Sequence, residues 1–145
     1  MNELRGFWRG KRIDNGEWTY GDLLVIPVKG RVNTLYEIIE RVAITGCQCV
    51  GPSTLGECTG LRDKNGTPIF EGDIIKTKEY GKDVGHSNIN DYDIFVVKYE
   101  PATFRLENNN RRFILDDDKY SKYEIIGNIH DNPELLKDVK RRKGR

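Results

Sequence analysis

Three cysteines are the residues of this 145-residue chain whose types and spacing come closest to a chemical site. Cys47 and Cys49 are separated by one residue, and Cys58 follows after eight intervening residues. Structural zinc is usually held by four ligands in paired C-x₂₋₄-C or histidine motifs, and no fourth ligand lies near this trio in the sequence. On a strand, Cys47 and Cys49 would share one face. We therefore expect buried thiols in a reducing compartment, with neither a zinc site nor a disulfide framework.

Histidines and aspartates give no second candidate for catalysis. His86 lies in a polar segment and His130 just before an expected helix, and no motif supplies either with an orienting partner. The acidic run at residues 116–118 does not match the calcium-loop pattern, and consecutive side chains on a strand point in alternate directions. Phosphate-binding loops and nucleophile elbows are also missing from the sequence. We therefore predict that the protein is not an enzyme and has no cofactor or metal.

Basic residues gather in two places that nucleic acid could contact. Residues 137–145 carry six basic groups and one acidic group, whereas residues 1–136 carry 18 and 22, for a net charge of +1. An acidic body does not attract phosphates over a wide face, and a short charged terminus is usually solvated. At residues 7–12, two aromatic residues are followed closely by three basic ones, a combination used by single-strand-binding surfaces. The candidate nucleic-acid contacts are Arg9, Lys11, Arg12, Lys140, Arg141, Arg142, Lys143 and Arg145.

Aromatic side chains are numerous and have two interpretations. They could form a stacking platform for nucleic acid, but in a β protein they more often fill the core or a subunit interface. We favour the second interpretation, and with it a homo-oligomer, because small barrels with open edges often pair between chains. The residues concerned are Trp8, Trp18, Tyr20, Tyr80, Tyr92, Tyr99 and Tyr120.

Turn signals divide the chain into short strands that must position these side chains. Asn65-Gly66 predicts a type I′ hairpin turn, and further turns are expected at residues 20–22 and 71–73. Adjacent apolar residues at 95–97 and 123–126 indicate strands that are covered on both faces. Residues 35–42 fit either a helix or a strand, and their β-branched residues favour a strand. The other expected strands are 16–20, 23–28, 74–78, 94–99, 104–106, 113–115 and 123–129.

The remaining elements and the composition describe a small protein of one domain or two packed subdomains. Asn132, Pro133 and Glu134 fit an N-cap, a first helical proline and an acidic first turn, which predicts a short C-terminal helix. The chain is 37% hydrophobic and 32% charged, as in ordinary globular proteins. It has no apolar run near the roughly 20 residues that span a bilayer. It also begins without an export leader, so we expect a cytoplasmic protein with no membrane partner.

Three segments of the chain together resemble the YopX family of phage and prophage proteins. They are residues 10–24, residues 52–75 with the string Gly60-Leu61-Arg62-Asp63-Lys64-Asn65-Gly66, and residues 123–136. Cys58 and His130 stand where the family usually has aromatic residues. The resemblance implies a mainly β protein with an SH3-like C-terminal barrel. The family has no agreed molecular function and no catalytic residues to carry over.

From the residues and the resemblance together we predict a mainly β architecture. An N-terminal β-subdomain (1–58) should pack on an SH3-like barrel with a short terminal helix (59–136), followed by a basic tail (137–145). We predict a phage or prophage accessory protein in the host cytoplasm that acts as a non-catalytic protein-interaction module for a host or phage protein. The alternative is a nucleic-acid-binding accessory factor that uses the basic tail and residues 7–12.

Overall fold

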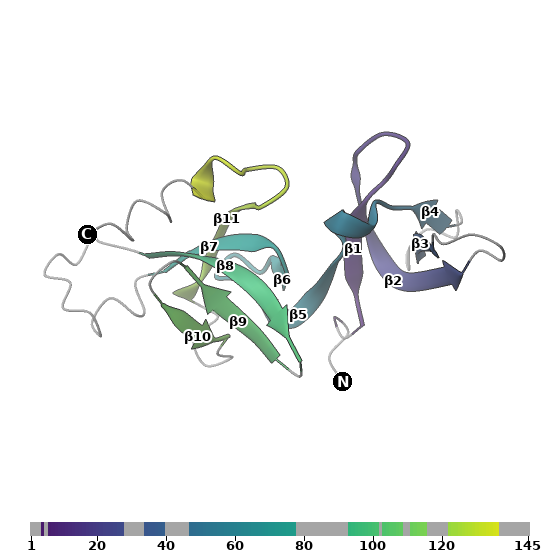
Figure 1. Ribbon diagram of the computed structural model, residues 1–145. Coiled ribbons are helices and arrows are strands. Elements are labelled where there is room, and N and C mark those ends of the chain that lie inside the picture. Colours follow the sequence, from purple (N-terminus) through teal and green to yellow (C-terminus); the bar gives the residue numbers. More distant parts are fainter. Residues whose placement is uncertain are drawn as a thin grey trace, which may run out of the picture. The chain divides into compact units, whose positions relative to one another are not determined.

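Antiparallel strands make up almost all of the regular structure, which confirms the mainly β prediction (Figure 1). The computed structural model describes residues 4, 6–27, 34–39, 47–77, 93–101, 103–108, 111–115 and 122–136. The chain divides into two compact units, residues 1–58 and 59–145. The first contains β1 (Trp8–Lys11), β2 (Trp18–Pro27), β3 (Thr34–Ile39), β4 (Cys47–Cys49), the 3₁₀ turn η1 (Pro52–Thr54) and the start of β5 (Gly56–Arg62). The second contains the rest of β5 and then β6 (Pro68–Phe70), β7 (Asp73–Thr77), β8 (Asp93–Glu100), β9 (Thr103–Glu107), β10 (Arg112–Ile114) and β11 (Glu124–Asn128).

In the first unit, the chain that follows β4 comes back to hydrogen-bond with residues at the end of β1. The order is β4-β3-β2-β1-β5, with β6 following β5. After β4, the Gly51 N–H donates to the Lys11 carbonyl over 2.9 Å, and the Ile13 N–H donates to the Cys49 carbonyl over 3.0 Å. Strands β1 to β4 therefore enclose a small interior that contains Ile38 and Val50, which are 0% and 1% exposed.

Strand β2 differs from the sequence-based expectation. Residues 20–22 were predicted to form a turn between two strands, and this prediction is wrong, because β2 runs without a break from Trp18 to Pro27. Its first half pairs with β1, which was not predicted as a strand, and its second half pairs with β3. Pairing partners on both sides override the turn preference of a Gly-Asp pair. The strand expected within residues 35–42 is confirmed over β3, and residues 40–42 lie outside the described part.

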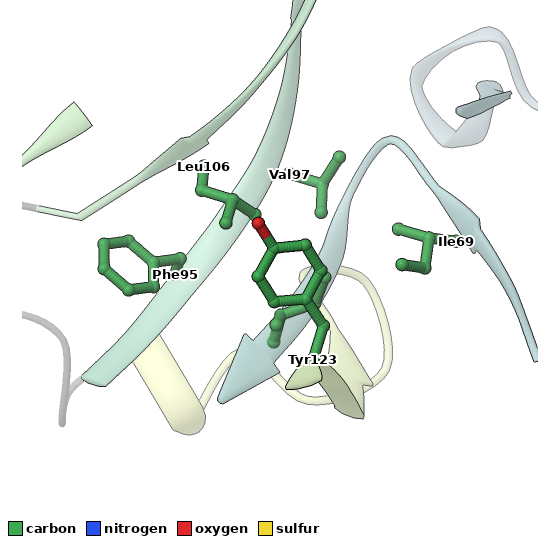
Figure 2. Close-up of a cluster of buried hydrophobic side chains, with 6 residues drawn as sticks. Ile69, Phe95, Val97, Leu106 and Tyr123 are labelled. Carbon is green, nitrogen blue, oxygen red and sulfur yellow. The ribbon is translucent and has the colours of Figure 1, made fainter. Parts of the chain in front are cut away.

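The second unit is built on a five-stranded antiparallel sheet of order β10-β9-β8-β7-β11. Figure 2 shows the cluster on one side of this sheet, in which six side chains are fully buried: Ile69, Ile75, Phe95, Val97, Leu106 and Tyr123. On the other side, a smaller cluster buries Ile74, Ile94 and Val96 against residues that include Leu135 and Leu136. The expectation that these strands are covered on both faces is therefore confirmed. An SH3-like barrel stays a prediction.

The hairpin between β5 and β6 turns one residue earlier than the sequence suggested. The Gly66 N–H donates to the Asp63 carbonyl over 2.9 Å, so Lys64 and Asn65 are the central residues of the turn. Gly66 follows with a φ of 83°, a left-handed conformation that glycine adopts at no steric cost. This is the three-residue hairpin loop that ends in a left-handed residue, and the prediction of a two-residue type I′ turn is wrong.

The Asp63 carboxylate joins this hairpin to the last strand of the sheet. Its Oδ1 accepts hydrogen bonds from the N–H groups of Asn65 and Thr67 over 2.9 and 3.0 Å, and its Oδ2 accepts one from the Ile125 N–H over 3.1 Å. Asp63 is only 4% exposed. Buried polar groups must be hydrogen-bonded, and here one side chain satisfies three backbone donors.

The turn predicted at residues 71–73 is confirmed. Gly72 has a φ of 93°, and its N–H donates to the Val97 carbonyl while its own carbonyl accepts from the Ile129 N–H. The Asp73 carboxylate accepts a hydrogen bond from the Phe70 N–H over 2.7 Å. The turn therefore joins β8 to the residue that follows β11.

The C-terminal end of the described chain is a helical turn at Leu135 and Leu136. The rest of the predicted helix lies outside the described residues. Asn132 lies at the start of this turn, where its carbonyl accepts a hydrogen bond from the Leu135 N–H over 3.0 Å. Its side-chain Oδ1 accepts one from the Asn128 N–H over 3.2 Å, which links the turn to the end of β11.

Gly127→Ala is expected to lower the free energy of unfolding by about 2 kcal/mol, the usual cost of overpacking. A Cβ atom at this position would lie 2.5 Å from Asn132 Oδ1 and 2.7 Å from its Cγ. Chemical denaturation measures the change. Gly51→Ala is the control, since its Cβ would meet Thr54 at an ordinary 3.7 Å. Equal stability of the two variants would contradict the prediction.

Candidate interaction surface

The β1–β2 hairpin brings cations and aromatic rings to one face. Lys11 is paired with Trp18 and Arg9 with Tyr20 in the register of the two strands. The Arg9 guanidinium carbon lies 4.6 Å from the centroid of the Trp18 ring, and the Lys11 Nζ lies 5.4 Å from it. Beside them, the rings of Phe7 and Tyr20 are stacked with centroids 6.3 Å apart. The structure therefore adds Trp18 and Tyr20 to the basic segment identified in the sequence.

All three cations that the sequence singled out here have contacts within the hairpin, and that of Lys11 is with the Trp18 ring. Arg9 is 6% exposed under its contact with Trp18. Arg12 forms a two-pronged ion pair with Asp14, at 2.9 Å from Nε to Oδ1 and 2.6 Å from Nη2 to Oδ2. These hydrogen bonds hold the pKa of the Asp14 carboxyl below its usual value. The candidates in the basic tail, Lys140, Arg141, Arg142, Lys143 and Arg145, lie outside the described residues.

The cysteines are not all buried. Cys58 is 4% exposed, as predicted, but Cys49 is exposed, so that prediction is wrong for Cys49. Its strand β4 pairs Cys49 with Glu37 on the side of the sheet that faces away from Ile38. The side chain of Cys47 is outside the described part. Within the described ranges, no three His, Cys, Asp or Glu side chains are grouped so that they could hold a metal ion.

Of the other polar candidates, His130 alone lies in the described part of the chain. The backbone N–H of His130 donates to Asn128 Oδ1 over 2.9 Å, within the turn that follows β11, and its side chain is half-buried. His86 and the acidic run at 116–118 lie outside the described residues. Two residues at the centre of the family resemblance, Asp63 and Asp73, accept hydrogen bonds from backbone N–H groups.

The outward face of the β2–β3 hairpin is apolar and accessible. We define the β2–β3 outer face by the six side chains that alternate outward on these strands: Asp22, Leu24, Ile26, Leu35, Glu37 and Ile39. Leu24, Leu35 and Ile39 are 37%, 43% and 37% exposed, while Ile38 on the opposite face is fully buried. Tyr20, 42% exposed, continues the face toward β1. Adjacent exposed apolar side chains of this kind are typical of interaction sites.

The sequence predicted strands at residues 23–28 and 35–42 but did not indicate that they pair. The consecutive apolar residues 23–26 do not show by themselves which side of the strand is open. The register of β2 with β3 places Leu24, Ile26 and Leu35 on one face.

The second unit presents a different surface over β8, β9 and β10. Glu100 forms ion pairs with Arg105 and Arg112, and Arg112 also lies 3.7 Å from Glu107. The exposed apolar residues described there, Tyr99 and Ile114, belong to different strands and opposite faces of the sheet. Among the described residues, the exposed apolar side chains that form a continuous face are therefore those of β2 and β3.

Comparison with family models identifies the family of this chain. The family model described as "YopX protein" matches residues 8–137, so the chain belongs to the YopX family. Among solved structures, the chain is similar to protein EF1440 from Enterococcus faecalis, with a TM-score of 0.49 and 23% sequence identity over 89% of this chain and 96% of that one. A search of curated proteins found no match. In the described part of the chain, no helix has the length and apolar character needed to cross a bilayer.

Proposed function

We propose that the protein is a non-catalytic protein-interaction module of a phage or prophage, acting in the cytoplasm of its bacterial host. The observation that carries the proposal is the β2–β3 outer face, on which Leu24, Leu35 and Ile39 are each more than one-third exposed. These side chains belong to neighbouring strands fixed in register, so they form one rigid surface. A preformed apolar surface binds a partner without the entropy cost of ordering it.

Nucleic acid is the second candidate ligand. Its support is the group of Arg9, Lys11 and Trp18 on one face of the β1–β2 hairpin. Against it, Arg9 is buried and Arg12 is paired with Asp14. Affinity for the phosphate backbone depends on cations that can reach it, and buried or ion-paired cations contribute little. The interaction module is therefore the proposal that we favour.

Leu24→Ser with Leu35→Ser is expected to reduce recovery of the bound protein at least tenfold, because each exposed leucine lost from an interface core removes roughly 1 kcal/mol or more. The measurement is an affinity pull-down from lysogenic or infected cells, treated with nuclease and quantified by mass spectrometry. Ile114→Ser is the control, because Ile114 is 60% exposed but lies in the second unit. Circular dichroism verifies that both variants are folded.

Two outcomes would overturn the proposal. The first is equal recovery of every protein by the wild type and the double leucine variant. The second is recovery of nucleic acid alone, lost on nuclease treatment and on deletion of residues 137–145, which would move the assignment to the second candidate.

A further inference from the structure

We infer that Asn65 and Gly66 form a self-modifying site, at which the asparagine side chain reacts with the backbone of the next residue and is converted to aspartate and isoaspartate. The co-reactant is water. The inference is independent of the proposed function, because it concerns the turn between β5 and β6. It follows from a comparison of the two Asn-Gly pairs of the sequence, Asn15-Gly16 and Asn65-Gly66.

The reaction joins the backbone nitrogen of the glycine to the side-chain carbonyl carbon of the asparagine. The Gly66 nitrogen gives up its proton to solvent and forms a bond to Asn65 Cγ. The bond from Cγ to the side-chain nitrogen breaks, and this nitrogen leaves as ammonia with a proton from solvent. Water then opens the resulting succinimide ring at either carbonyl, which gives aspartate or isoaspartate. Neither step requires an enzyme or a redox partner.

Both pairs offer a similar backbone nitrogen. The Gly16 N–H donates to the Arg12 carbonyl over 2.9 Å. The Gly66 N–H donates to the Asp63 carbonyl over the same distance. The two glycines are left-handed, with φ angles of 73° and 83°, and a Cβ atom added at either would have no atom within 4 Å. Both glycines therefore lie in open space, and ring closure on their nitrogens is not hindered from that side.

The two asparagine side chains differ in how they are held. Asn15 Oδ1 accepts a hydrogen bond from the Glu17 N–H over 2.9 Å, and Asn15 Nδ2 donates to Glu17 Oε2 over 3.4 Å. Breaking one such bond reduces the reactive fraction by about fivefold. The Asn65 side chain is exposed, and the hydrogen bond described for this residue runs from its backbone N–H to Asp63 Oδ1. Asn65 can therefore rotate toward the Gly66 nitrogen without that cost.

The products alter the turn that the Asp63 carboxylate organises. Either product places a new carboxylate at residue 65, whose N–H lies 2.9 Å from Asp63 Oδ1, and like charges close together repel one another. Isoaspartate also adds a methylene group to the main chain, in a loop whose N–H groups are matched to one carboxylate. The same carboxylate accepts a hydrogen bond from the Ile125 N–H. Conversion of Asn65 therefore weakens the link between the hairpin and β11.

The experiment ages the folded full-length protein in warm, mildly alkaline buffer and follows both Asn-Gly pairs by peptide mapping and mass spectrometry. An isoaspartyl methyltransferase quantifies the isoaspartate. We expect Asn65 to convert at least about fivefold faster than Asn15, with both products present. Ageing in denaturant, where neither side chain is held, should bring the two rates close together.

Asn65→Gln is the matched variant, because glutamine must close a larger ring that forms more slowly. Hydrogen exchange at Ile125 should speed up in the aged wild type and stay unchanged in aged Asn65→Gln. Conversion of Asn65 that is no faster than that of Asn15 in the folded protein, including no conversion of either, overturns the inference. Aspartate formed without isoaspartate would exclude the succinimide and also overturn it. Equal exchange at Ile125 in the two aged proteins would contradict the effect on the hairpin.

Discussion

Phe95→Ala is expected to lower the free energy of unfolding by about 3–5 kcal/mol, the usual cost of removing a buried aromatic ring. Phe95 is 0% exposed and belongs to the central cluster of the second unit (Figure 2). Its ring meets that of Phe113 edge-on, with centroids 5.9 Å apart, and the Arg111 guanidinium carbon lies 5.7 Å from its centroid. The substitution removes all of these contacts and leaves a cavity between β8 and the opposing side chains.

Denaturant titration, monitored by circular dichroism, measures this loss of stability. Tyr99→Ala is the matched control on the same strand, because Tyr99 is 49% exposed and has an edge-to-face contact with Phe104 at 5.3 Å. We expect the control to lose about 1 kcal/mol, consistent with one exposed aromatic pair. Phe95→Leu should lower the free energy of unfolding by more than Tyr99→Ala and by less than Phe95→Ala. A loss at Phe95→Ala no larger than that at Tyr99→Ala would contradict the assignment of Phe95 to the core.

Asp63→Ala is expected to lower the free energy of unfolding by about 3–5 kcal/mol, because it leaves three backbone N–H groups without their acceptor in a mostly buried site. The donors belong to Asn65, Thr67 and Ile125. Each buried donor left unsatisfied costs about 1–3 kcal/mol, and partial access of water to the turn reduces the sum. The hairpin would also lose its side-chain link to β11.

Asp63→Asn tests which of these bonds matter. The amide oxygen can keep the two bonds to the turn, while its NH₂ group would face the Ile125 N–H and lose that bond. We expect Asp63→Asn to lower the free energy of unfolding, but by less than Asp63→Ala does. Asn65→Ala is the control, because the Asn65 side chain is exposed and its backbone N–H is retained. Hydrogen exchange at Ile125 should speed up in both Asp63 variants and stay unchanged in the control.

The segment that carries the family resemblance most clearly thus has a structural explanation. Asp63, Gly66, Gly72 and Asp73 shape two turns and bind backbone groups of other strands. Residues that set backbone geometry are required by the fold whatever the protein binds. The β2–β3 outer face lies outside this segment.

Local sequence determined a large part of this protein. Residue types that favour strands, separated by turn residues, were enough to predict the mainly β architecture and the strand at residues 35–39. The left-handed glycines at 66 and 72 could be expected because few other residues adopt that conformation. Adjacent apolar residues in β8 and β11 correctly indicated strands with both faces covered, since a strand with one wet face would alternate.

Tertiary structure alone decided the features that depend on distant partners. β2 continues through Gly21 because β1 pairs with its first half and β3 with its second. The hairpin turn centres on Lys64 and Asn65 as the Asp63 carboxylate binds both its own loop and β11. The face on which Leu24 and Cys49 are exposed follows from pairing across strands, and shifting a strand by one residue would exchange its faces. Register is a property of two segments together, so neither segment read by itself could place the β2–β3 outer face.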